Sequence, residues 1–212
     1  MTLSTYTDLK SAVADWLDRA DLTARIPDFI ALAEAQMNRS LRLRRMIARS
    51  TASLDAEFTT VPSDFLEVIA LTLDDGQVLT PAPPQVLAAL KAAASATARP
   101  RRYAVVGEAF HLHPPPDAAY GVTLTYYAKI PALSASTTTN WVLAEAPDAY
   151  LFGALLQAAP YLRDTDAIAI WSAGYDAALA GLRAGQTTEA GPLQVEPGLQ
   201  TLRTVSSSTT EF

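Results

Sequence analysis

The sequence contains no cysteine among its 212 residues. Disulfides, thiolate metal sites and cysteine catalysis are therefore excluded together. Histidine is scarce, with two residues, and there is no glycine-rich phosphate loop, serine elbow or HExxH pair. Because common catalytic sites contain such motifs and this sequence lacks them, we expect no cofactor and no enzymatic activity.

Long apolar runs and an excess of positive charge are also missing. No segment reaches the roughly 18 consecutive apolar residues of a membrane helix, and the first ten residues lack the apolar run of a signal peptide. We therefore expect no membrane span and no secretory leader. The net charge of −6 argues against a chain that binds nucleic acid through a generally basic surface.

The segment that organises our interpretation reads IPDFIALAEAQMNRSLRLRRMIAR, from Ile26 to Arg49. Pro27 suits the first turn of a helix, and we interpret Asp28 and Glu34 as favouring the positive end of its dipole. We predict a helix over residues 27–48. At about 100° per residue, its apolar stripe holds Ile26, Ile30, Ala33, Met37 and Leu41, and the opposite side holds Arg39, Arg42, Arg45 and Arg49.

Arg44 does not fit this helix, because the same spacing places it on the apolar stripe. A buried guanidinium is costly unless an acid pairs with it. Arg44 therefore needs an acidic partner, or the end of the helix has left the core.

Three further helices are indicated, over residues 7–19, 147–162 and 165–184. Thr5 and Asp8 have the spacing of a capping box for the first, and Asp164 is placed to cap the last. Apolar residues surround the 147–162 helix on almost all sides, so we expect it to be central. The sequence predicts an α+β fold, in which a four-helix bundle belongs to a domain over residues 1–185.

Between the second and third of these helices we predict a small antiparallel β-sheet inserted over about residues 58–130. Asp75 and Gly76 mark one hairpin, between strands 65–73 and 77–79, and Gly107 and Glu108 mark another, between strands 103–106 and 109–113. Residues 122–128 give a further strand. An alanine-rich helix lies between residues 84 and 99.

Residues 186–212 are predicted to form an extended carboxyl-terminal arm, because they are rich in Thr, Ser, Gly, Pro and Gln and cannot build a core alone. We expect the arm to lie on another chain, by strand addition or in a groove. Its apolar residues are the candidate contacts: Leu193, Val195, Leu199, Leu202, Val205 and Phe212.

The arginines are the second candidate interface, comprising Arg39, Arg42, Arg44, Arg45 and Arg49. Arginine favours bidentate pairing with carboxylates, which indicates an acidic protein partner. An alternative is a DNA-binding protein that contacts phosphates through the Arg39 to Arg49 helix face. A second alternative is a metal-dependent hydrolase, because His111 and His113 would share one face of a strand, with Asp117 as a third ligand.

Several ordered blocks of the sequence resemble a known family. They are WLDRADL with IPDFIALAEAQMNRSLRLRRM, PRRYAVVGEAFHLHPPPD, YYAKIPALS and NWVLAEAPDAYLFGALLQAAPYLRD. Over residues 6–182 the chain is similar to the adaptor proteins, or head-tail connectors, of tailed bacteriophages. The resemblance does not cover the residues past Gly185.

The resemblance implies a structural virion protein, made in the host cytoplasm and located at the head-tail interface. It implies a homo-oligomeric ring of twelve subunits below the portal protein, with a downstream connector or tail protein as the other partner. Genomic DNA would pass through the ring without specific binding, because an acidic channel repels it. The arginine face would then meet acidic partners.

Overall fold

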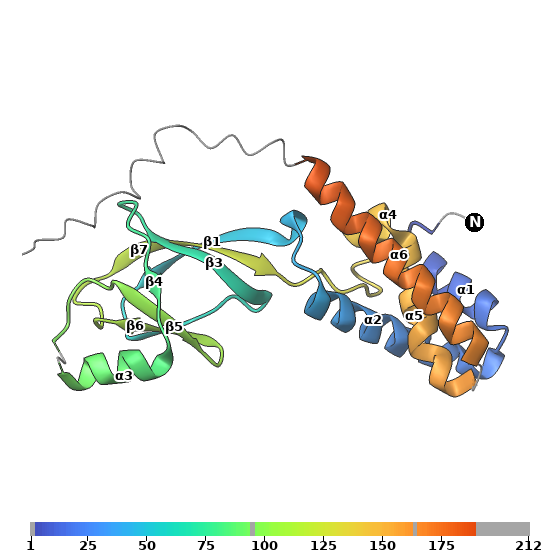
Figure 1. The fold of residues 1–212 in the computed structure, drawn as a ribbon, viewed down its shortest axis with the longest axis horizontal. Helices are drawn as coiled ribbons and strands as arrows, with labels where there is room; N and C mark the ends of the chain where they lie inside the picture. Colours follow the sequence, from blue (N-terminus) through green and yellow to red (C-terminus); the bar gives the residue numbers. More distant parts are fainter. Residues whose placement is uncertain (1–2, 94–95, 163–164, 190–212) are drawn as a thin grey trace, which may run out of the picture.

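The main helices and the strands occupy opposite ends of an elongated molecule, and one short helix lies beside the strands (Figure 1). The computed structural model describes residues 3–93, 96–162 and 165–189. Within these ranges the predicted α+β class is confirmed, with six α-helices and two small sheets; the bundle arrangement of the main helices stays a prediction. The helices are α1 (Tyr6–Leu17), α2 (Ile26–Ser40), α3 (Pro84–Ala93), α4 (Trp141–Glu145), α5 (Pro147–Leu162) and α6 (Thr165–Glu189).

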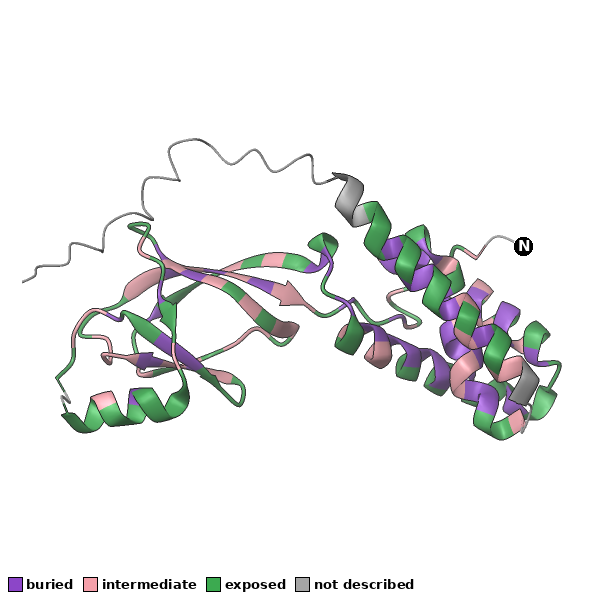
Figure 2. Cartoon of the chain, in the orientation of Figure 1, coloured by how far each residue is buried: buried purple, intermediate pink, exposed green. Residues whose placement is uncertain are grey.

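Helix α5 is the centre of the helical part, as its nearly continuous apolar surface predicts. It contacts α1, α2, α4 and α6, and Tyr150, Ala154 and Leu155 are fully buried. In Figure 2 the buried residues are concentrated where these helices face one another. No helix within the described ranges combines the length and apolarity needed to cross a lipid bilayer.

The predicted start of α1 is confirmed by its cap. The Thr5 hydroxyl accepts from the Asp8 backbone N–H at 3.2 Å, and the Asp8 carboxylate accepts from the Thr5 N–H at 3.0 Å. The helix ends two residues earlier than predicted, at Leu17, because Asp18 adopts a left-handed conformation with φ of 48°. A short 3₁₀ helix, Ala20–Arg25, then leads into α2.

Helix α2 ends at Ser40, so the predicted helix over residues 27–48 is wrong beyond that residue. Leu41 and Leu43 are both buried, while Arg42 and Arg44 between and after them are exposed. On a helix, residues two apart point in nearly opposite directions, whereas extended backbone places them on one side. Burying both leucines therefore requires the helix to end, and this puts Arg44 in solvent.

The strands form two sheets, not the single antiparallel sheet that we predicted, and they begin at residue 47, not 58. One sheet has the order β1-β7-β3 and is antiparallel; the other has the order β2-β6-β5-β4, with β4 parallel to β5. The strands are β1 (Ile47–Leu54), β2 (Phe58–Thr60), β3 (Phe65–Leu73), β4 (Thr80–Pro81), β5 (Arg102–Val106), β6 (Ala109–His113) and β7 (Tyr120–Ala128).

The two sheets pack face to face over a second apolar core. Alternate residues of β7, Val122, Leu124 and Tyr126, point into it, and Phe110 and Leu112 of β6 meet them from the other sheet. This alternation is the period of a strand with one buried face. The confirmed β5–β6 hairpin turns at Gly107, where φ of 60° suits glycine.

The other predicted hairpin and the alanine-rich helix are present but shorter. After the turn at Gly76, with φ of 89°, Val78 makes an isolated bridge to Thr72, and the chain then continues into β4. The described part of helix α3 runs from Pro84 to Ala93, and residues 96–99 are not helical, so the helix does not reach the predicted residue 99. Leu87 is its buried residue within that range. The helix packs against β5 and β6.

Helix α6 continues to Glu189, five residues beyond the predicted end at 184. Residues 186–189 are therefore helical, and any carboxyl-terminal arm begins after them. The arm contacts predicted at Leu193, Val195, Leu199, Leu202, Val205 and Phe212 lie outside the described residues, as does Asp164.

We predict that Gly153→Val destabilises the protein by about 1–3 kcal/mol through overpacking. A Cβ at Gly153 would lie 3.1 Å from both the Ala33 Cβ and the Tyr175 ring, where α5 packs between α2 and α6. Gly181→Ala is the matched control, because nothing lies within 4 Å of its added Cβ, and we expect a gain of up to about 1 kcal/mol. Equal urea-unfolding midpoints for the two variants would contradict this packing.

Candidate protein–protein interface

The prediction that Arg39, Arg42, Arg45 and Arg49 share the helix face opposite the apolar stripe is wrong, because the helix ends at Ser40. Arg39 is the last basic residue of α2, Arg44 and Arg45 lie in a 3₁₀ turn (Arg44–Met46), and Arg49 is on β1. Because the helix ends at Ser40, the arginines follow the chain from the helical part into the first sheet. They are therefore distributed over α2, the 3₁₀ turn and β1, at the junction of the two parts.

Arg42 connects the end of α2 to the first sheet. Its Nε donates to the Glu67 carboxylate of β3 at 2.8 Å, and Nη1 donates to the backbone carbonyls of Asn38 and Leu41 at 2.9 and 2.6 Å. The last carbonyls of a helix have no partner within the helix. Arg42 therefore satisfies the end of α2 and ties it to the sheet.

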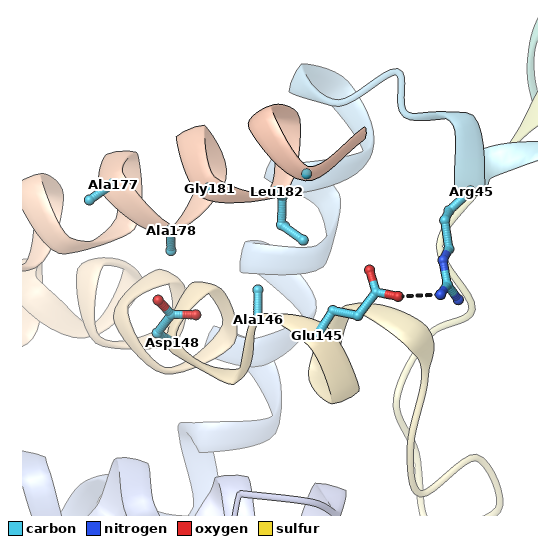
Figure 3. Close-up of a pocket in the computed structure, with 9 residues that line it drawn as sticks. Arg45, Glu145, Ala146, Asp148, Ala177, Ala178, Gly181 and Leu182 are labelled. Carbon is cyan, nitrogen blue, oxygen red and sulfur yellow. Dashed lines mark ion pairs between the residues drawn. The ribbon is translucent and has the colours of Figure 1, made fainter. Parts of the chain in front are cut away.

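Arg45 forms a second link between the two parts, and it also lines a groove. Its guanidinium pairs with Glu145 of α4 at 2.6 Å, which joins the entry to β1 to the helical part (Figure 3). The groove holds about 350 Å³ and is lined on one side by small residues of α6, including Ala177, Ala178 and Gly181. Asp148, from the first turn of α5, lies on the other side.

Of the five candidate arginines, Arg39, Arg44 and Arg49 make no ion pair or hydrogen bond within the described part of the chain. All three are exposed, and Arg49 faces outward from β1 opposite Thr125 of β7. An exposed guanidinium with no internal partner is free to bind a carboxylate of another chain. These three residues are therefore the candidates for contact with an acidic partner.

A buried polar network, which sequence reasoning missed, fixes the chain that returns from the sheets to the helices. Glu34 is 6% exposed, and its carboxylate accepts from the Leu133 N–H at 2.8 Å and from the Tyr150 hydroxyl at 3.0 Å. The Asn140 amide donates to the Tyr150 oxygen at 2.6 Å and to the Pro131 carbonyl at 2.7 Å. The network joins α2, the connecting segment and α5.

Asn38 adds a parallel contact one turn further along α2, where its side chain accepts from the Ile130 N–H at 2.8 Å. Our interpretation of Glu34 as a dipole partner is therefore wrong. A signal was present in the sequence, because Glu34 lies four residues after Ile30 and three before Met37, inside the apolar stripe of α2. An acid within such a stripe predicts a buried partner.

Burial raises the pKa of Glu34, because the charged carboxylate loses solvation, while the hydrogen bonds from Leu133 and Tyr150 oppose the rise. Burial also raises the pKa of Tyr150, and the nearby Glu34 charge adds to that shift. Tyr150 thus stays protonated and donates to Glu34. The network acts as a structural clamp, and all three of its side chains, from Glu34, Asn140 and Tyr150, are buried.

The two histidines share one face of β6, as predicted, but their contacts are structural. His111 Nε2 lies 3.0 Å from Glu57, which also binds Lys91 of α3 at 2.6 Å, and the Phe58 ring stacks on His111. Burial, followed by the charge of Arg102, lowers the pKa of His113. Within the described ranges no three His, Cys, Asp or Glu side chains are grouped to hold a metal ion.

Comparison with known protein families matches residues 4–196 to the SU10 adaptor protein family. The chain belongs to the SU10 adaptor family. This confirms the resemblance to phage adaptor proteins, and the matched region extends past Gly185, where our resemblance ended. No curated protein matches the chain.

Membership of the adaptor family makes the surface residues at the junction candidates for contacts with other proteins. An adaptor works through its surfaces, and in this chain the surface arginines lie where the helical part meets the sheets. Arg42 and Arg45 hold that junction together, and Arg44 and Arg49 project from it.

We predict that Glu34→Gln flattens the pH dependence of stability. Because the folded pKa is raised above the ordinary 4.5, the stability that Glu34 contributes is full below about pH 4.5 and is lost as pH rises through the raised value. Glutamine keeps the oxygen that accepts both hydrogen bonds and cannot ionise. The difference in free energy of unfolding between the variant and the wild type should therefore shift in favour of the variant as pH rises toward 7.

Urea unfolding between pH 4 and pH 7 measures this effect. Glu108→Gln, at the exposed β5–β6 turn, is the control and should keep the wild-type profile. Parallel pH profiles for Glu34→Gln and the wild type would contradict a buried Glu34.

Proposed function

We propose that this chain is a structural head-tail adaptor, a virion protein of which twelve copies form a ring below the portal and continue the DNA channel toward the tail. The observation that carries the proposal is the match to the SU10 adaptor family across residues 4–196. The portal protein on one side and a downstream connector or tail protein on the other are its proposed partners.

The charge of the chain supports a passive channel. A subunit with net charge −6 repeats that charge around a ring, and the summed field repels the DNA phosphates. DNA then slides past without being held. No catalytic step is required of such a subunit.

The proposed partner contacts are of two kinds. Arg39, Arg44 and Arg49 are exposed and meet acidic surfaces of neighbouring chains, while Arg42 and Arg45 hold the backbone that presents them. The apolar arm residues, Leu193, Val195, Leu199, Leu202, Val205 and Phe212, provide the second kind of contact, in which the arm lies on another chain.

Neither alternative function is supported by a specific contact. A DNA-binding helix would need its arginines in one row, but two of them pair with Glu67 and Glu145. A hydrolase would need His111 and His113 open to a metal, but His111 contacts Glu57 and stacks on Phe58.

The mass of the assembled species tests the proposal. Mixed with the portal protein, the chain should give a complex that contains twelve copies, and the doubly reversed variant Arg44→Glu with Arg49→Glu should bind at least about tenfold more weakly. Arg101→Glu reverses one exposed charge on the residue before β5 and is the control. A chain that stays monomeric in the presence of the portal protein would contradict the proposal.

A further inference from the structure

The two edges of the three-stranded sheet differ in how well they are protected. Strand β3 carries two register shifts, and near its end the bridge from Thr72 to Val78 covers its free side. Strand β1 pairs all eight of its residues with β7 in unbroken register, and it has no proline, lysine or bulge. Bulges and such residues are what normally block an edge. The edge of β1 is therefore open to strand addition.

An apolar groove opens beside this edge. It holds about 250 Å³ and lies between β1 and β2, with Leu71, Phe110, Val122 and Leu124 among its lining. The groove exists because the inward residues of β1 include Ser50 and Ala52, which are too small to close the gap between the sheets.

Two further polar groups, one in the groove and one on the outer side of β1, indicate what kind of strand could bind there. The Thr59 hydroxyl, which also lines the groove, is buried and has no hydrogen-bond partner among the described residues. On the outer side of β1 stands Arg49, exposed and unpaired there. A suitable strand has apolar residues two apart to point inward and an acid that points outward.

Residues 193–196 of the chain itself have this pattern. Leu193 and Val195 alternate with Gln194 and Glu196, and Glu196 is the one charged residue between Ala190 and Pro197. The acid complements Arg49, because β1 carries no acidic residue of its own. The family match includes these four residues, since it extends to residue 196.

The position of α6 allows the segment to reach such an edge. Gly185 of α6 lines the same groove as Arg45, two residues before β1 begins, so the chain that follows α6 starts at the junction of the two parts. Residues 190–192, which link α6 to this segment, can span roughly 10 Å when extended. The segment can therefore reach an edge that lies close to the end of α6.

We propose that the β1 edge of each subunit receives residues 193–196 of the neighbouring copy as an added strand. Leu193 and Val195 enter the groove beside Ser50 and Ala52, and Glu196 pairs with Arg49. Each copy then donates one segment and accepts one, the head-to-tail contact that closes a ring. The inference rests on the proposed ring, which supplies the neighbour.

The absence of cysteine makes a cross-linking test direct. Thr51 and Gln194 are both outward positions in this pairing, and opposed residues of adjacent strands lie about 4.5–5.5 Å apart, which a disulfide can bridge. Thr51→Cys and Gln194→Cys variants are mixed, assembled with the portal protein and oxidised. We expect a band of two cross-linked chains on a gel run without reductant. Ser53→Cys is tested in place of Thr51→Cys as well, because the added strand could pair with β1 two residues out of this register.

Ile69→Cys, exposed on the opposite edge strand β3, is the matched control and should give no band with Gln194→Cys. Adding Leu193→Asp and Val195→Asp to the Gln194→Cys chain should lower cross-linking about tenfold or more. Thr201→Asp with Ser207→Asp, in the same arm but outside the strand and outside the proposed apolar contacts, should leave it unchanged.

The native mass of the same samples before oxidation separates this inference from the proposed function. An intact ring without cross-linking at residue 51 or 53 overturns the strand addition alone. A double variant, Thr51→Cys with Gln194→Cys, that links only within one chain also overturns it. A chain that stays monomeric with the portal protein present overturns both, because no neighbour supplies the strand.

Discussion

The buried carboxylate of Glu34 is the constraint on which the arrangement of this molecule depends. The chain leaves the helical part after α2 and returns to it through the segment before α4. Glu34 and Asn38 of α2 accept from backbone N–H groups of that returning segment, and Tyr150 and Asn140 complete the network. A buried polar group without partners costs about 1–3 kcal/mol, so the helix and the segment must meet in one arrangement. The outgoing and returning chains are thereby held by the same helix.

This constraint allows the junction to carry surface residues. With the backbone fixed from within, Arg42 satisfies the end of α2 and joins it to β3, and Arg45 joins the entry to β1 to α4. The neighbouring arginines are exposed to solvent. Along β1, by contrast, the small residues Ser50 and Ala52 leave a groove between the two sheets, and the outer edge of the strand is not blocked. A subunit of an assembly needs both features, a rigid internal frame and surfaces that its own chain does not complete. The SU10 adaptor family is a family in which such surfaces have a use.

Sequence patterns predicted the elements whose structure is decided locally. The capping box at Thr5, the apolar surface of α5 and the glycine turn at Gly107 each contain their own explanation within a few residues. The errors arose where distant contacts decide. Leu41 and Leu43 alternate over too short a stretch to outweigh the helical pattern before them, and the division into two sheets depends on β1 pairing with β7, far along the chain. Glu34 was misread because its partner, Tyr150, lies on another helix.

Amide hydrogen exchange at Ile130 and Leu133 tests most directly whether α2 holds the returning segment. Both N–H groups donate to α2 side chains, so exchange there requires the helical part to open. We expect their protection to match that of Leu155 in the core of α5 and to exceed clearly that of exposed Ala135 in the same segment. Exchange of Ile130 and Leu133 as fast as that of Ala135 would show that the segment moves independently of α2, and would contradict the account.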